Sequence, residues 1–239
     1  ILLNETFKIA HKRAPDLADE LHLLKEMFLP GKNFSRNKTE EINAFFKRSM
    51  QFTGPIMAKG AEDTAYYTYN RFIAHNEVDD SPANFGISDS DFHDEMIKRQ
   101  NHYPLSLSAT STHDTKRGED ARARLMVLSN IPELWTRQTG YWRIVNLRFK
   151  KIHENKEIPN LNDEYLIYQT IVGFMPTDLL PDDNFEGRLV NYIKKALREG
   201  KMESDWADPD ENYENNTRHF IHSILSPGSE FMISLKPFL

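Results

Sequence analysis

A histidine and an aspartate, His113 and Asp114, stand side by side in the stretch SATSTHDTKRGEDARARL, residues 108–125. They follow a short run in which apolar and hydroxyl residues alternate, and a basic, helix-like segment comes next. A carboxylate at the carboxyl end of a strand is where barrel enzymes place catalytic groups. The same aspartate could instead cap the next helix and pair with Lys116 or Arg117. The residues alone leave both interpretations open.

A second group of chemically capable side chains lies in TGPIMAKGAEDTAYYTYNR, residues 53–71. It contains the charged residues Lys59, Glu62, Asp63 and Arg71 and the tyrosines Tyr66, Tyr67 and Tyr69. Aromatic faces stack on sugars and fixed charges bind hydroxyls, so this composition suits a carbohydrate site. The alternative is an apolar helix stripe of Tyr66, Tyr69 and Phe72 or Ile73, with the charges in solvent.

The sequence gives no indication of a metal or a cofactor. The histidines His93, His102 and His113 are nine and eleven residues apart, which is not a metal-ligand spacing. The chain has no cysteine, and this excludes disulfides, thiolate catalysis and zinc–cysteine sites. We therefore expect no metal and no cofactor.

The composition is that of a soluble globular protein, with 39% apolar and 28% charged residues in a chain of 239. The net charge of −6 argues against a dedicated nucleic-acid binder. No stretch approaches the roughly 20 apolar residues that a membrane span needs. We predict a cytoplasmic protein without nucleic-acid or membrane partners. Because the chain opens on Ile1 and not on Met, we expect it to be a piece of a longer protein.

Helical periodicity dominates the chain and predicts a mainly α fold. Apolar residues recur every three or four positions in residues 4–28, with one interruption near Pro15. Further helices are predicted near residues 39–50, 62–78, 88–100, 118–130, 131–152, 162–174, 183–203 and 209–226, with a break at Gly54-Pro55 and a cap at Ser88. The one convincing strand covers residues 104–112, and it needs partner strands to form a sheet.

Four stretches together resemble one known family. They are TGPIMAKGAEDTAYYTYNRFIAHNEV, LSATSTHDTKRGEDARARLMVLS, YQTIVG and KKALREGKMESDWADPDENYE. In order and spacing they are similar to maltooligosyl trehalose synthase, a member of the α-amylase superfamily, whose members use a (β/α)8 barrel. The resemblance implies a helical insertion and the C-terminal region of such an enzyme, with one or two short barrel-type strands. It also implies a maltooligosaccharide substrate, whose reducing-end α-1,4 bond is rearranged to an α,α-1,1 bond in trehalose biosynthesis.

The resemblance also assigns roles to residues. Asp114 would be the catalytic carboxylate that stabilises the transition state by holding the hydroxyls of the sugar in the −1 subsite, and His113 would bind the same sugar. The family's Lys-Gly-x-Glu-Asp and Thr-Lys-Arg motifs match here, and they would line or support the acceptor side. The substrate-binding residues implied in this way are Lys59, Glu62, Asp63, Lys116 and Arg117, together with Tyr66.

Two departures accompany the resemblance. Where the family continues Gly-Gly-Asp-Pro after Asn-Glu-Val, this chain reads Asp79-Asp80-Ser81-Pro82. A retaining mechanism also needs a nucleophile and a general acid about 5 Å apart. The family carries both on earlier strands, so we expect them in a remainder of the barrel upstream of Ile1. The isolated chain is therefore expected to be inactive.

The expected organisation has three parts. These are a helical subdomain at residues 1–103, a barrel strand and helix with the His-Asp pair at 104–130, and a C-terminal helical region at 131–239. An alternative function is a non-catalytic helical carbohydrate-binding or scaffold module derived from the enzyme. A hydrolase that releases trehalose from a chain end is a third interpretation, which the stretches at 53–78 and 192–214 disfavour.

Overall fold

The computed structural model describes residues 2–28, 36–78, 80, 85–176, 178 and 181–239. Most of the Asp79–Pro82 departure therefore lies outside the described residues. The chain divides into two compact units, Ile1–Ala58 and Lys59–Leu239. The three-part organisation predicted from the sequence stays a prediction.

The first unit is built from three helices, α1 (Leu2–Arg13), α2 (Ala18–Phe28) and α3 (Arg36–Ile56), with a 3-10 turn, η1 (Pro15–Leu17), between the first two. The predicted interruption near Pro15 is confirmed. The ring of Phe28 packs edge-on against Phe45 and Phe46, at centroid distances of 5.9 and 5.6 Å. The break predicted at Gly54-Pro55 is wrong, because α3 continues through Pro55. A proline removes one backbone donor, and the chain widens directly afterwards into a π-helix, η2 (Met57–Ala65).

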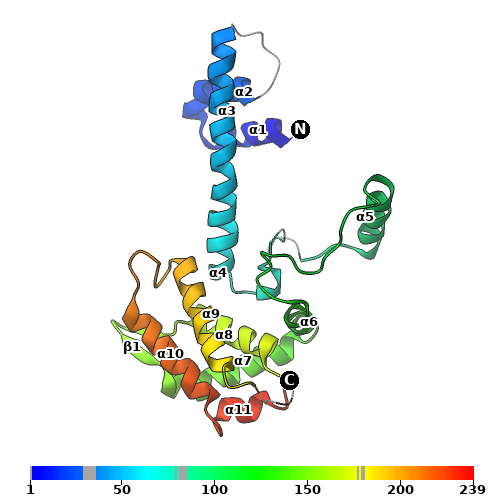
Figure 1. Ribbon diagram of the computed structural model, residues 1–239. Coiled ribbons are helices and arrows are strands. Elements are labelled where there is room, and N and C mark those ends of the chain that lie inside the picture. The colour runs from blue at the N-terminus through cyan, green and yellow to red at the C-terminus, as the bar shows by residue number, and fades with distance from the viewer. Residues whose placement is uncertain (1, 29–35, 79, 81–84, 177, 179–180) are drawn as a thin grey trace. The chain divides into compact units, whose positions relative to one another are not determined.

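The second unit is also mainly helical, as the sequence predicts. Its helices are α4 (Tyr66–Thr68), η3 (Ile73–His75), α5 (Asp89–His102), α6 (Glu119–Val127), η4 (Leu128–Asn130), α7 (Pro132–Asn146), η5 (Leu147–Phe149), α8 (Leu161–Phe174), α9 (Phe185–Gly200), α10 (Glu211–Leu225) and α11 (Glu230–Leu235). Helices α7 to α11 gather into one bundle (Figure 1). Ser88 caps α5 as predicted, and its side chain accepts a hydrogen bond from the amide of Asp91.

The strand predicted at residues 104–112 is wrong. The described residues contain two short strands, β1 (Lys151–His153) and β2 (Lys156–Ile158). They form an antiparallel hairpin that begins at the end of the helix predicted near 131–152 and lies mostly between it and the next predicted helix. Glu154 and Asn155 have positive φ angles of 49° and 63°, the backbone that a tight hairpin turn requires.

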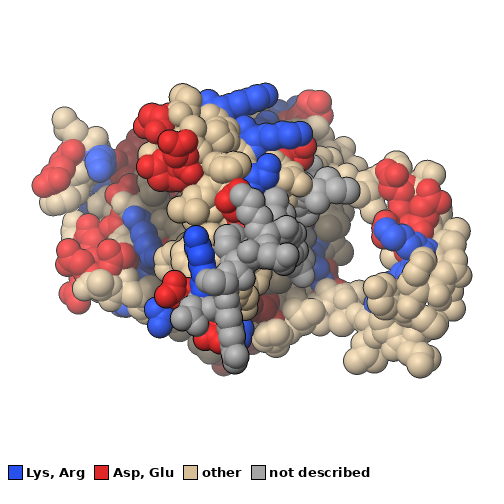
Figure 2. Space-filling model, turned by 90° about the horizontal axis from the view of Figure 1, so that it is seen from above, with Lys and Arg blue, Asp and Glu red and all other residues tan. Residues whose placement is uncertain are grey.

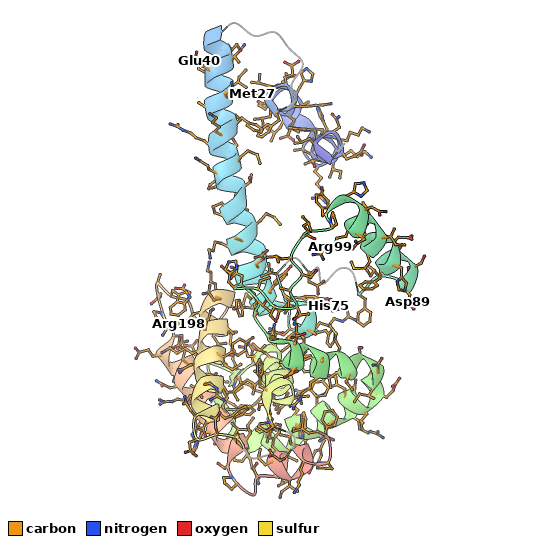
Figure 3. The ribbon with its side chains drawn as sticks, turned by 45° about the vertical axis from the view of Figure 1, so that its right-hand side comes forward. Met27, Glu40, His75, Asp89, Arg99 and Arg198 are labelled. Carbon is orange, nitrogen blue, oxygen red and sulfur yellow. The ribbon has the colours of Figure 1, made fainter. Side chains whose placement is uncertain are left out.

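Apolar and hydroxyl residues alternate in the sequence of residues 104–112, but this segment has no strand partner among the described residues. The side chains of Leu105 and Leu107 are 94% and 96% exposed. Arg99 on α5, labelled in Figure 3, holds this segment by donating to the Ser106 hydroxyl at 3.0 Å and to the Leu107 carbonyl at 2.7 Å. A strand requires a neighbour to satisfy its backbone groups, and none is described here.

The hydrophobic core of the second unit surrounds α8. The side chains of Leu166, Ile167, Tyr168 and Ile171 are at most 2% exposed, and α8 packs against α6 and α9. Aromatic rings complete this core, where Trp142 contacts Tyr168, Phe231 and Phe238. Helix α8 is therefore the element on which the other segments of this unit are positioned.

The surface carries both signs of charge. Figure 2 shows lysine and arginine side chains interspersed with aspartate and glutamate across the visible face. Among the described residues, no helix is both long enough and apolar enough to cross a bilayer.

Burial around α8 can be tested with two isoleucines. Ile171 on α8 is fully buried, whereas Ile144 on α7 is 74% exposed. We expect Ile171→Ala to lower the free energy of unfolding by about 2 to 5 kcal/mol, because it leaves a cavity. Ile144→Ala, the matched control, should change it by less than about 0.5 kcal/mol. Equal effects in urea titrations would contradict the placement of α8 at the core.

A buried carboxylate makes the stability of this unit depend on pH. Glu214 on α10 accepts two hydrogen bonds from Arg198 on α9, at 2.6 and 2.9 Å, and one from Ser204 at 2.7 Å. The Arg198 guanidinium lowers the pKa of Glu214 to about 2. Because the folded pKa is depressed, the stabilisation is complete above the ordinary pKa of 4.5 and is lost as the pH falls toward 2.

The corresponding measurement is the free energy of unfolding between pH 5 and pH 2.5. We expect the wild-type chain to lose about 2 kcal/mol more than Glu214→Gln across this range, because a folded carboxylate with a pKa of about 2 is still partly ionised at pH 2.5. Parallel pH profiles for the two proteins would show that Glu214 is not held in this way.

Candidate functional site

Two segments that are far apart in the sequence meet in the second unit. Asp63, on η2, pairs with the Lys59 ammonium one turn away, and its other carboxylate oxygen lies 3.7 Å from the Lys116 ammonium. The hydrogen bond from Lys59 lowers the pKa of Asp63, and the same hydrogen bond raises the pKa of Lys59. The Lys-Gly-x-Glu-Asp and Thr-Lys-Arg motifs therefore share one cluster of fixed charges.

A buried ion pair anchors the second of these segments. The Arg117 guanidinium lies 3.5 Å from a carboxylate oxygen of Glu77, and both side chains are buried. Arg117 also donates to the Asn76 carbonyl at 3.2 Å and to the Tyr192 hydroxyl at 2.8 Å. The other Glu77 oxygen accepts from the Lys116 amide at 2.7 Å. Arg117 is therefore enclosed by protein and can act on a ligand only by positioning its neighbours.

His113 and Asp114 lie in the exposed turn directly before this anchor. The turn is held by the Thr112 amide, which donates to the Thr115 hydroxyl at 2.7 Å. The capping interpretation of Asp114 is wrong, because the residue at the N-cap of α6 is Gly118, without a side-chain cap. The pairing interpretation is wrong as well, since Lys116 pairs with Asp63 and Arg117 with Glu77.

Asp114 thus makes no ion pair with the described residues, although it lies close enough to contribute to the raised pKa of Lys59. An exposed carboxylate without an ion pair can accept hydrogen bonds from the hydroxyls of a ligand. The sugar-binding role that the family resemblance implies for Asp114 stays a prediction.

The remaining predicted residues lie on the same segment as Lys59. Glu62 is half-buried on η2. The Tyr66 hydroxyl donates to the Asp80 carbonyl, so this phenol holds the backbone at Asp80. Tyr67 is buried and stacks below the Lys116 ammonium, 5.4 Å from its ring centroid. Burial raises the pKa of Tyr67, which keeps the phenol neutral beside these charges.

Three polar residues that the sequence analysis did not single out hold this frame together. The Asn76 amide donates to the Tyr66 and Tyr69 carbonyls, both at 2.8 Å. Gln169 on α8 donates to the Asn70 carbonyl at 2.7 Å and accepts from the Ile73 amide at 2.9 Å. Gln169 and the Asn76–Glu77 pair all lie in stretches that carried the family resemblance, but nothing in their spacing marked them as buried.

The described residues contain no group of three histidine, aspartate or glutamate side chains that could hold a metal ion.

Comparison with known proteins identifies the chain's relatives. No family model matches it. A curated protein of Mycobacterium tuberculosis, named "Putative maltooligosyl trehalose synthase", is 32% identical over 178 residues, which is 74% of this chain and 22% of the relative. The solved maltooligosyltrehalose synthase of Arthrobacter ramosus is 30% identical, with a TM-score of 0.77 over 99% of this chain and 28% of its own. The chain is homologous to part of maltooligosyl trehalose synthase.

A second solved structure, of a hypothetical maltooligosyl trehalose synthase from Sulfolobus tokodaii, agrees with this result. It is 30% identical, with a TM-score of 0.70 over 95% of this chain and 33% of its own. The resemblance to maltooligosyl trehalose synthase that the sequence predicted is thus confirmed. The chain spans about a fifth of the length of the curated relative.

The anchor beneath the site can be tested by breaking one side of it. We expect Arg117→Met to lower the free energy of unfolding by about 3 to 5 kcal/mol, because Glu77 would be left as a buried, uncompensated charge. The double variant Arg117→Met/Glu77→Gln should recover part of that loss. Chemical denaturation of the wild type, both single variants and the double variant provides the measurement. Strictly additive losses would contradict a direct Arg117–Glu77 interaction.

Proposed function

We propose that this chain is part of a maltooligosyl trehalose synthase, which converts the reducing-end α-1,4 bond of a maltooligosaccharide into an α,α-1,1 bond. The observation that carries the proposal is the meeting of the family's two charged motifs through Asp63 and Lys116, in the segment whose preceding turn exposes Asp114. The solved relatives support it, since those with this name match nearly the whole chain.

In this proposal the exposed turn binds the sugar whose bond is rearranged. Asp114 accepts hydrogen bonds from the ring hydroxyls in the −1 subsite, and His113 binds the same ring. Hydrogen bonds of this kind strengthen as the ring approaches an oxocarbenium-like state. In glycoside hydrolysis they lower the free energy of the transition state by roughly several kcal/mol. An aspartate without an ion pair suits this role, because its acceptor oxygens are available to the ligand.

The charge cluster binds the acceptor side. Lys59 is an exposed donor, and Glu62 and Asp63 are acceptors, so they match the mixed hydrogen-bonding needs of sugar hydroxyls. Lys116, whose side chain is only 8% exposed, supports Asp63 from the protein interior. The ion pairs of Asp63 with Lys59 and Lys116 fix these three side chains before the ligand arrives, which reduces the entropy lost on binding. Arg117 and Tyr66 hold the backbone of the two segments, and their contribution is positioning.

The nucleophile and the general acid are proposed to come from the rest of the barrel. The family resemblance assigns neither of them to a residue of this chain. The chain without that remainder should therefore bind a maltooligosaccharide without changing its number of reducing ends.

The test is the Asp114→Asn substitution in a protein that contains this chain together with the family's remaining barrel. We expect turnover to fall by about a thousandfold or more, because several kcal/mol of transition-state stabilisation are lost. The midpoint of unfolding should not change, since the side chain is exposed. Asp120→Asn, an exposed aspartate in the first turn of α6, is the matched control and should retain turnover. Near-normal activity of Asp114→Asn would remove this residue from catalysis.

A further inference from the structure

A hollow in the second unit lies between α8, α9 and the short helix α4, and it shares no described residue with the charge cluster. It has a volume of about 510 Å³, a size typical of small-molecule sites. Part of its wall is made of buried apolar side chains, those of Leu166, Ala196 and Leu197. The polar lining includes amides, a hydroxyl and two carboxylates, from Thr68, Asn160, Asn162, Asp163 and Glu203.

One of the two carboxylates in this hollow is buried. Asp163, in the first turn of α8, is only 7% exposed. Its Oδ2 atom accepts a hydrogen bond from the Tyr213 hydroxyl at 2.6 Å. Among the described residues, none donates to its other oxygen, Oδ1, and none forms an ion pair with it. A buried carboxylate is normally paired with a positive group, so this one has an acceptor oxygen available to a ligand.

Glu203, in the segment after α9, brings a second carboxylate to the same hollow. It accepts a hydrogen bond from the side-chain amide of Asn160 at 3.2 Å. No lysine, arginine or histidine in the described part of the chain lines this hollow. Burial, and to a smaller extent the charge of Glu203, raises the pKa of Asp163 to about 6, the direction expected when a counter-charge is missing. The lining therefore carries negative charge that it does not itself balance.

We infer that this hollow binds a small aliphatic amine, with an ammonium group beside Asp163 and Glu203 and the carbon chain against the apolar wall. An ammonium group supplies hydrogen-bond donors and the missing positive charge. A metal ion does not fit, because no group of three histidine, aspartate or glutamate side chains among the described residues could hold one. The buried leucines of the wall favour a ligand with an apolar body. The inference does not rest on the proposed function, since it uses none of the sugar-binding residues.

The test is a calorimetric titration of the chain with 1,4-diaminobutane at pH 7.5. We expect saturable binding, whereas 1,4-butanediol, which has the same carbon chain and no charge, should not bind. Asp163→Asn keeps an acceptor for the Tyr213 hydroxyl but removes the charge, so it should weaken the affinity by about tenfold or more. Glu133→Gln, an exposed acid in the first turn of α7 outside the hollow, is the matched control and should leave the affinity unchanged.

The pH dependence of the affinity separates a charge effect from a structural effect. Below a pKa of about 6 the Asp163 carboxyl becomes neutral, so the wild-type affinity should fall by up to about tenfold between pH 7.5 and pH 5. The other titratable groups around Asp163 are Glu203 and the phenols of Tyr213 and Tyr67. Burial raises the pKa of both phenols, so they stay neutral throughout this range. Asp163→Asn should lose most of the pH dependence, whereas Glu203→Gln should bind more weakly and retain it.

Three results would overturn the inference. They are the absence of saturable diamine binding, equally tight binding of 1,4-butanediol, and wild-type affinity in both Asp163→Asn and Glu203→Gln. The midpoint of unfolding of each variant shows whether its fold is retained, and Glu203→Gln provides the test if Asp163→Asn does not fold. These outcomes leave the turnover test of Asp114 unaffected, so failure here is distinguishable from failure of the proposed function.

Discussion

The candidate site depends on a carboxylate buried beneath it. Glu77 accepts a hydrogen bond from the Lys116 amide, and its carboxylate lies beside the Arg117 guanidinium. The segment just before Glu77 is held by Gln169 of α8, which accepts a hydrogen bond from the Ile73 amide. Burying an unpaired carboxylate is costly, whereas one with a guanidinium and a backbone donor is tolerated. This requirement determines where the Thr-Lys-Arg segment lies. The exposed turn with His113 and Asp114 is then positioned by the residues that follow it.

The helical content could be predicted because it follows from the local spacing of apolar residues. The segments at 118–130, 162–174, 183–203 and 209–226 correspond to α6, α8, α9 and α10. The strand at 104–112 failed for a physical reason, since alternation indicates which face could be buried but not whether a partner strand exists. The break at Gly54-Pro55 failed because a proline can be accommodated when the neighbouring turn changes its hydrogen bonding.

The chemistry of the candidate site could be predicted in part. The charged types at Lys59, Asp63 and Lys116 indicated a polar binding surface, and the family resemblance placed them together. The sequence could not show that Arg117 is enclosed while Asp114 is exposed, because neighbouring residues in a loop can face opposite ways. Nor could it reveal the pairing of Glu77, since this arises from contacts between segments distant in the chain.

These observations lead to one account. A bundle around α8 holds two short segments against each other, and Asp63 joins the exposed Lys59 ammonium to the largely buried Lys116 ammonium between them. The turn directly before Lys116 exposes Asp114, which makes no ion pair with the described residues. The solved relatives cover nearly all of this chain while extending far beyond it. In the proposed enzyme, this region supplies sugar-binding groups to a centre whose nucleophile and acid come from elsewhere in the barrel.

The most direct measurement is an amide NMR titration of the chain with maltohexaose, with reducing ends assayed in the same sample. The account predicts saturable shifts at Gly60, Asp63, His113 and Asp114 and an unchanged number of reducing ends. Loss of reducing ends would show that the chain carries its own catalytic carboxylates. Amide resonances of these residues that stay unmoved at saturating sugar would contradict the assignment of the charge cluster as a sugar site.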